Sequence, residues 1–238
     1  MSSQAEDDEP ISYSGRLSRQ LIVQTALAQI DRSGSDGLSM RSLAKDLGVE
    51  AMSLYRYVHG REDLLEGVTD ALMGGLTSRL DEKLTDHWQG FLQTLAHEIR
   101  QIAVDHPMAF PLVATRHPAA PWLRPPLRSI EIVDTFLAAL IGYGFSDEQA
   151  VAAYRSFTSF LLGQLLLESA VRGAALSPVE EPLDEGDADI PEGDANKSLE
   201  DVPEVRRLRP LLSEDRSEEE FEASLELLLD RLGMELSQ

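Results

Sequence analysis

One short stretch, residues 39–61, restricts the possible folds of this chain more than any other part of it. Ser39 is a good N-cap, because its hydroxyl can accept a hydrogen bond from a free backbone N–H two or three residues later. The apolar residues that follow are spaced as one inward helix face, and Gly48 then offers the left-handed residue with which helices commonly end. A second apolar set begins at Val49 and fits a helix of about two turns. This spacing predicts a helix-turn-helix whose second helix has a size suited to a DNA major groove.

The same stretch, continued to residue 65, reads SMRSLAKDLGVEAMSLYRYVHGREDLL and contains a specific motif. The motif is Leu54-Tyr55-Arg56-Tyr57-Val58, followed by Arg61 and the pair Leu64-Leu65. It resembles the DNA-binding segment of the tetracycline-repressor (TetR) family, and the resemblance extends from about residue 17 to about residue 72. The resemblance implies an all-α fold, in which a three-helix DNA-binding domain is joined to a larger helical domain for ligand binding and dimerisation. We therefore expect a disordered arm over residues 1–15, a DNA-binding domain over 16–66 and a regulatory domain over 67–238.

The net charge of −21 would by itself argue against a nucleic-acid partner. The charge is unevenly distributed, however, because residues 16–61 hold seven basic and four acidic side chains, a net charge of +3. Of the 42 acidic residues, 38 lie outside this span, and 20 of them lie beyond residue 175. Phosphate attraction is local, since salt screens charges over about 8–10 Å. The distribution therefore permits DNA binding without predicting it.

The composition and motifs exclude several other kinds of protein. The chain has no cysteine, which rules out disulfides and cysteine-ligated zinc and suits a reducing cytoplasm. No run of 18 apolar residues predicts a membrane-spanning helix, so no membrane partner is expected. The spacing of His87, His97, His106 and His117 does not suit a metal site, and there is no phosphate-binding glycine loop or nucleophile elbow. We expect a soluble cytoplasmic protein that is not an enzyme and needs no metal or cofactor.

Apolar residues recur at helical spacing through most of the remaining chain, and no segment predicts a strand. Residues 174–203 differ, because their many acids and four prolines predict a disordered acidic loop. The helix that ends near Val171 is apolar almost all round and must therefore be buried on several sides. The predicted helices cover 18–32, 61–76, 85–106, 109–115, 127–142, 146–171 and 217–232, and the last of them is expected to end at Gly233.

The resemblance to the TetR family offers an account of this apolar helix. It implies that one side of residues 149–171 lines a ligand cavity, while another packs with the C-terminal helix in a dimeric four-helix interface. Two-fold symmetry would also let one motif in each chain match a palindromic operator in double-stranded DNA. We therefore expect a homodimer.

The resemblance and the chemistry of the side chains together indicate a DNA-binding set. In this family the position of Arg41 often reaches a base edge, and its fork suits guanine O6 and N7, although a solvated arginine is the alternative. Ser53 and Tyr55 are expected to donate to phosphates, with partial core packing as the alternative for Tyr55. Arg61 and the backbone N–H groups that open the next helix form a further phosphate site. The other members are Ala51 and Met52, which could touch thymine methyl groups, and Arg56 and Tyr57, which could bind either bases or phosphates.

The expected ligand cavity lies among the helices predicted over 85–106, 109–115, 127–142 and 149–171. The alternative is that many of its candidate residues are ordinary core, so we expect only part of the set to line a cavity. The candidates are Leu92, Leu95, Ile99, Phe110, Val113, Phe136, Leu137, Tyr154, Phe157, Thr158 and Leu161, with His97, Arg100, Arg116 and Trp122 near the rim.

One departure from the family pattern limits what the resemblance implies about the ligand. Aligned through the helix that contains Trp88, the tetracycline-binding members use a polar amide, a magnesium-ligating histidine and a threonine at the positions of Leu95, Val113 and Arg116. A magnesium–tetracycline chelate would lose its histidine anchor here. We therefore expect an apolar or amphipathic organic effector in its place.

The favoured interpretation is an all-α, homodimeric transcriptional repressor that leaves its operator when a small organic effector binds. A first alternative is a DNA-binding activator or nucleoid-type regulator without a ligand. A second is a helical enzyme or protein-interaction module whose motif no longer binds DNA. Ligand-induced release from DNA would separate the first two functions, and failure to bind any DNA at low salt would favour the third.

Overall fold

The computed structural model describes residues 17–76, 79–80, 87–175, 204, 207–208, 211 and 214–236. The predicted arm over 1–15 and the predicted acidic loop over 174–203, apart from its first two residues, lie outside this part of the chain. Within the described residues every regular element is helical, and none is a strand. The elements are α1 (Arg19–Ser33), η1 (Ser35–Gly37), α2 (Met40–Asp46), α3 (Ala51–Leu54), α4 (Arg61–Met73), α6 (Trp88–Asp105), η2 (Phe110–Ala114), α7 (Ile130–Gly142), α8 (Asp147–Val171) and α10 (Ser217–Leu236).

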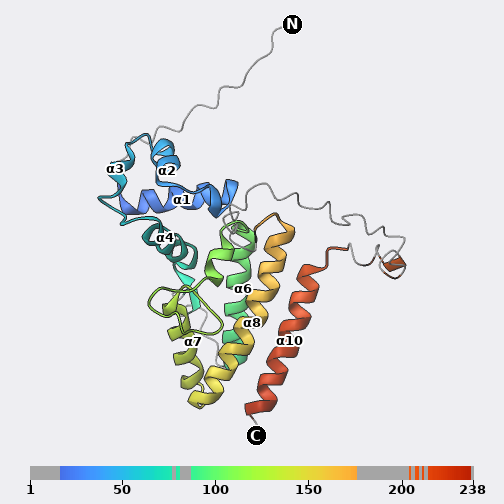
Figure 1. The fold of residues 1–238 in the computed structure, drawn as a ribbon. Helices are drawn as coiled ribbons and strands as arrows, with labels where there is room; N and C mark the ends of the chain where they lie inside the picture. Colours follow the sequence, from blue (N-terminus) through green and yellow to red (C-terminus); the bar gives the residue numbers. More distant parts are fainter. Residues whose placement is uncertain are drawn as a thin grey trace, which may run out of the picture.

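Helices α1, α2 and α3 form a small cluster at one end of the molecule, and α4 connects it to the rest (Figure 1). The predicted caps are confirmed: the hydroxyl of Ser18 accepts a hydrogen bond from Leu21 N at the start of α1, and Ser39 forms a capping box with Ser42 at the start of α2. Side chains of all four helices share one core, which includes Ile22, Leu43, Leu54 and Leu64.

Helix α4 packs closely against α1 because it has a glycine at the point of contact. A Cβ atom at Gly67 would lie 2.8 Å from Cγ2 of Val23, a distance that real Cβ atoms do not adopt. Any larger residue would therefore force the two helices apart. The absence of a side chain at Gly67 thus sets the spacing between α1 and α4.

The other end of the molecule is a bundle of the longer helices α6, α7, α8 and α10. In Figure 1, α8 lies between α6 and α10. Aromatic rings fill the centre of this bundle. The ring of Phe136 on α7 lies 5.5 Å from that of Phe157 and 5.7 Å from that of Tyr154, both on α8, and 6.4 Å from that of Phe91 on α6. This arrangement explains why α8 is apolar on more than one side: α6, α7 and α10 all pack against it.

Three helix ends differ clearly from the prediction. Helix α4, predicted to reach residue 76, ends at Met73, before Gly74. Helix α7 begins at Ile130 instead of Leu127, since the backbone N–H of Arg128 donates to the carbonyl of Val113, outside the helix. The predicted end of the last helix at Gly233 is wrong, since α10 continues to Leu236. Gly233 lies against the ring of Trp88 on α6, and this packing accommodates a glycine inside the helix.

Candidate functional site

The predicted DNA-binding residues lie on and around α2 and α3. Gly48 has a φ of 66°, the left-handed conformation expected where α2 ends. Helix α3 is shorter than the two turns predicted: its α-helical residues end at Leu54, whose carbonyl accepts hydrogen bonds from both Tyr57 N and Val58 N. The chain therefore leaves α3 in a tight turn that contains Tyr55 and Arg56.

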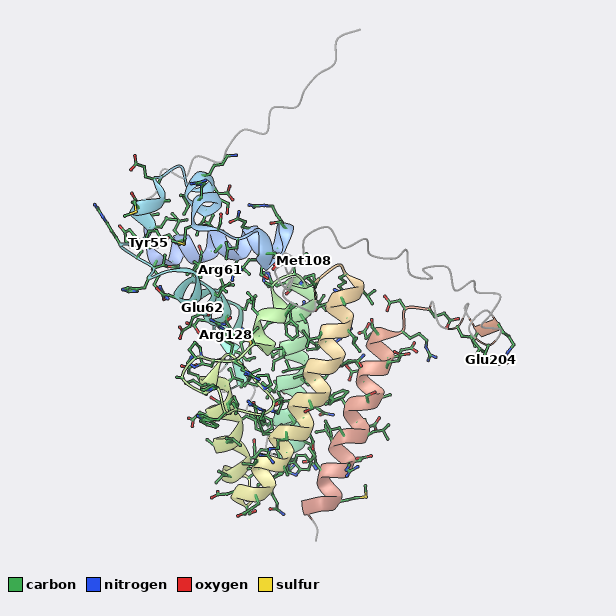
Figure 2. All side chains as sticks on the ribbon, viewed as in Figure 1. Tyr55, Arg61, Glu62, Met108, Arg128 and Glu204 are labelled. Carbon is green, nitrogen blue, oxygen red and sulfur yellow. The ribbon has the colours of Figure 1, made fainter. Side chains whose placement is uncertain are left out.

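Most of the predicted DNA-binding side chains are open to solvent. Met52 is 74% exposed and Tyr55 is 47% exposed, while Arg41 and Arg56 are also exposed. Figure 2 shows Tyr55 at the end of the molecule farthest from the long helices. Three others are partly buried: Ala51 and Tyr57 pack partly against the core, and Ser53 is half-buried. Arg61 is exposed, but its guanidinium donates a hydrogen bond to the carbonyl of Ser35 at 2.9 Å.

The first turn of α4, where a phosphate site was predicted, already contains two carboxylates, Glu62 and Asp63. Asp63 accepts a hydrogen bond from the backbone N–H of His59 at 2.6 Å and forms an ion pair with Arg19 at 2.7 Å. The hydrogen bond from Arg19 is the main reason that the pKa of Asp63 is lowered to about 2. The carboxylate therefore stays charged at neutral pH and ties the start of α4 to the start of α1.

One ion pair and two contacts between a histidine and a carboxylate connect α1 and α4 with the rest of the chain. Arg128, which is buried, donates to the carboxylate of Glu62 on α4 at 3.1 Å and to the hydroxyl of Thr115 at 3.2 Å, and Figure 2 shows Glu62 and Arg128 together at this junction. The ring of His106 lies 2.8 Å from Asp31 on α1, and that of His117 lies 3.4 Å from Glu66 on α4. Sequence reasoning missed these pairs, because their partners are far apart in the chain.

A small apolar chamber lies among α6, η2, α7 and α8. Its volume is about 20 Å³, room for about one water molecule, so it is nearly filled in this conformation. Eight of the predicted ligand residues line it, together with four that were not predicted. The predicted residues are Leu95, Ile99, Val113, Phe136, Tyr154, Phe157, Thr158 and Leu161, and the four others are Leu127, Ile132, Val133 and Leu162.

The chamber has two hydroxyl groups among its lining residues. The hydroxyl of Tyr154 donates to the carbonyl of Pro125 at 3.0 Å, and Thr158 is also buried. Burial is the main reason that the pKa of Tyr154 is raised to about 12. Tyr154 is therefore a neutral hydrogen-bond donor at neutral pH, and the lining residues include no charged side chain.

The remaining predicted ligand residues lie elsewhere. His97 and Arg100 point to the other side of α6, because both have acidic partners there: His97 lies 2.8 Å from Glu222 on α10, and Arg100 lies 3.2 Å from Glu168 on α8. Leu92 and Phe110 are buried in the core and Arg116 is exposed. Trp122 and Leu137 line a second hollow, the α7 groove, with Ala119, Ala120, Leu123, Ile130, Glu131, Val133, Asp134 and Thr135.

Large apolar side chains are also exposed on α8 and α10, which lie side by side (Figure 1). On α8, Leu167 is 63% exposed, and Val171, one helical turn later, is 90% exposed. On α10, Leu227 and Met234 are similarly exposed about two turns apart. A strip of this kind on two adjacent helices is typical of a protein–protein interface.

Two further kinds of site were considered. In the described part of the chain no group of three or more histidine, aspartate or glutamate side chains could hold a metal ion. Helix α8 is long and apolar enough to cross a membrane on length and composition alone, with 44% of its most apolar window buried. Such a composition is also that of a core helix, and α8 packs against three other helices of the bundle.

Comparison with known proteins decides the family. Residues 82–236 match the family model described as "Tetracyclin repressor-like, C-terminal domain". The chain is also 31% identical over 179 residues to an "HTH-type transcriptional regulator" of Saccharopolyspora erythraea, which covers 74% of this chain and 72% of that protein. The chain belongs to the TetR family of transcriptional regulators.

Other TetR-family proteins resemble it over nearly their whole length. The class A tetracycline repressor from transposon 1721 of Escherichia coli is 26% identical over 221 residues, which is 92% of this chain and 91% of that protein. ActR of Streptomyces coelicolor in complex with actinorhodin has the same fold, with a TM-score of 0.63 and 24% identity over 92% of this chain and 96% of that one. The predicted family and all-α architecture are therefore confirmed, and this TetR-family chain is a regulator and not an enzyme.

Proposed function

We propose that this TetR-family regulator is a cytoplasmic, homodimeric repressor that binds a palindromic operator and is released from it by a small organic effector. The observation that carries the proposal is a short connection between two candidate sites. Leu127 lines the apolar chamber, and the next residue, Arg128, donates to Glu62 at the start of α4. Val113, which also lines the chamber, accepts the backbone hydrogen bond of Arg128 at 3.0 Å.

This connection gives the effector a physical route to the DNA-binding part. A ligand larger than the present 20 Å³ must push the lining residues apart, including Val113 and Leu127. Because Arg128 is joined to both, its contact with Glu62 would change with the chamber. The ligand would favour the conformation in which the chamber is open, in proportion to its greater affinity for that conformation.

The homodimer is supported by the exposed apolar strip of Leu167, Val171, Leu227 and Met234 on α8 and α10. Two copies related by a two-fold axis would cover this strip with each other and form a four-helix interface. The same axis would place two copies of α3 on one face of DNA, one helical turn of the duplex apart. The exposed Arg41, Met52, Tyr55 and Arg56 would then face successive major grooves.

One observation favours a second candidate function, a DNA-binding regulator without a ligand. The chamber is nearly filled, and it is far below the roughly 300–1,000 Å³ of typical small-molecule sites. In this case the lining residues are only the core of the bundle. Binding to the operator would then not respond to any small molecule.

The test begins with the purified full-length chain and sheared genomic DNA. Fragments that it retains are sequenced, and the shared palindrome is measured by electrophoretic mobility shift and by light scattering of the complex. A set of apolar and amphipathic compounds is then added to the complex. Release of a dimer from the palindrome supports the proposal, whereas a monomer on DNA, or an operator without two-fold symmetry, contradicts it. Stable operator binding with every compound favours the second candidate.

A further inference from the structure

The α7 groove is larger than the apolar chamber. Its volume is about 640 Å³, within the range of about 300–1,000 Å³ that is usual for small-molecule sites. Val133 lines both the groove and the apolar chamber, so one side chain belongs to the wall of both. A ligand in the groove would therefore lie next to the chamber without having to open it first.

The walls of the groove are mainly apolar and include an exposed aromatic ring. Trp122 is 73% exposed, and Leu123, Ile130 and Leu137 line the same hollow. A tryptophan left in water at the side of a concave surface is a common feature of binding sites, because its ring supplies a large contact area with few rotatable bonds.

The charge of the groove has one sign. Glu131 and Asp134 are the charged side chains among the lining residues, and they lie one helical turn apart on the exposed side of α7. Arg124 in the adjoining loop does not line the groove, and its guanidinium donates to the carbonyls of Pro121 and Leu123 at 2.8 and 2.9 Å.

The negative charge of this region also reaches α4. Burial is the main reason that the pKa of Asp70 on α4 is raised, and the charges of Glu131 and Glu66 raise it further, while Arg19 and His117 act in the opposite direction. The charge of Glu131 therefore acts on Asp70. A positive charge placed beside Glu131 would be stabilised.

We propose that the α7 groove binds organic cations with an apolar chain or ring, which place the cation between Glu131 and Asp134 beside the face of Trp122. The apolar part of such a molecule would extend towards Val133 and the chamber. Attraction between a cation and an aromatic face adds to the two ionic contacts. Binding of a cation in the groove does not depend on the proposed function. The identification of this cation as the effector rests on the proposed function.

The charge of the groove also argues against one other occupant, the chain's own residues 176–203. This segment contains ten acidic residues and one lysine, so Glu131 and Asp134 would repel it. A small cation is the occupant that the lining residues favour.

The experiment uses two probes with equal chains and opposite charges, decyltrimethylammonium and decanoate, each below its critical micelle concentration. Binding to the full-length chain is measured by calorimetry and by the fluorescence of Trp122, with Trp122→Phe as the reference for the signal from Trp88. We expect the cation to bind about tenfold more tightly than the anion and to change the Trp122 signal. Equal affinities, or binding without a change at Trp122, would overturn the inference.

Two double variants locate the charge effect. Glu131→Gln with Asp134→Asn should remove the preference for the cation while both probes still bind. The matched control, Glu218→Gln with Glu220→Gln, removes the same net charge from exposed positions of α10 that do not line the groove. The preference should survive in the control. If both double variants lose it equally, the effect belongs to the total charge of the protein, and the groove is not the site.

Two further measurements separate this inference from other outcomes. Deleting residues 178–203 should leave the affinities nearly unchanged, and a large equal gain for both probes would show that this segment occupies the groove and would overturn the inference. Operator release is then measured with the same probes. Cation-selective binding without release supports the groove and contradicts the effector role, whereas release by other compounds without groove binding supports the proposed function and contradicts the groove.

Discussion

The two ends of this molecule are stabilised in different ways. The bundle of long helices is filled by large side chains, such as Phe136, Phe157 and Leu165, which are almost completely buried. The DNA-binding part has helices as short as the seven residues of α2 and the four of α3, with the capping box of Ser39 and the ion pair of Arg19 with Asp63 at helix ends. A reading surface must leave its side chains in water, so less apolar area remains for its own core. We therefore expect truncation of a side chain to affect mainly stability in the bundle and mainly DNA affinity on the exposed surface of the DNA-binding part.

The largest effect is expected from Phe157→Ala. Phe157 is 1% exposed and its ring packs at a tilt against that of Phe136, so truncation should lower the free energy of unfolding by about 3–5 kcal/mol. Denaturant unfolding measures this loss. Phe157→Leu keeps most of the volume and serves as the variant for operator and effector titrations. If Phe157→Ala leaves the stability of the chain unchanged, the bundle is not the well-packed half.

The next effect concerns DNA affinity and not stability. If Arg41 forks onto a guanine, Arg41→Ala should weaken operator binding by about 1–3 kcal/mol and flatten discrimination at one base pair in each half-site. Titration against every single-base operator variant, at two salt concentrations, measures both. Arg155→Ala, an exposed position on α8, removes the same charge as a control. An equal loss on all sequences would make Arg41 a phosphate contact.

Tyr55→Phe provides the complementary variant for the same titration. It keeps the ring and removes only the hydroxyl, which is expected to donate to a phosphate. Affinity should fall by a similar factor for every operator variant, because phosphate contacts carry little direct sequence information. A loss confined to one base position would instead assign Tyr55 to base recognition.

A smaller change in stability is expected from Ser39→Ala. The hydroxyl of Ser39 accepts from Ser42 N at 3.0 Å, and loss of such a cap costs about 1 kcal/mol. Thermal unfolding measures this cost. Ser217→Ala at the first residue of α10 is a useful comparison, since it removes a hydroxyl that bonds only to the exposed Asp215. If the two variants are equally stable, the cap is less important to the DNA-binding part than its geometry indicates.

The smallest effect concerns pH. The pKa of Asp63 is about 2 in the folded chain, mainly because of Arg19, and its ordinary value is 3.8. A carboxylate whose pKa is lowered by folding stabilises the fold above its ordinary pKa, and this contribution is lost as the pH falls from 3.8 towards 2. Carboxyl NMR should show Asp63 titrating well below the other exposed acids. The difference should become smaller in Arg19→Gln, where only the hydrogen bonds from His59 still lower the pKa of Asp63, and an unchanged difference would assign the shift to another cause.

Helix positions and their capping residues were largely predictable, because they follow from local periodicity. Ser18, Ser39 and Gly48 have the roles that their residue types indicate. Eight of the residues that the family resemblance assigned to ligand binding line the chamber, and their role in binding stays a prediction. His97 and Arg100 were expected near its rim, but they do not line it and contact acidic partners on α10 and α8. Periodicity predicts which residues share a helix face. It does not predict that a carboxylate far away in the sequence will bind His97 or Arg100.

The ends of helices were the other limit. Gly233 was expected to end α10, but the helix continues to Leu236, although glycine is about 1 kcal/mol less favourable in a helix than alanine. The chamber volume was also inaccessible to sequence reasoning, because an apolar residue predicts burial equally well in a filled core and in a cavity wall.

The close approach at Gly67 has a mechanical consequence. With no Cβ between them, α1 and α4 lie too near each other to slide independently, and the ion pair between Arg19 and Asp63 fastens the start of one helix to the start of the other. We therefore expect α1 and α4 to move together, and α4 ends at Met73, directly before Gly74 and Gly75. A displacement of Glu62 would then be transmitted through α1 to α2 and α3.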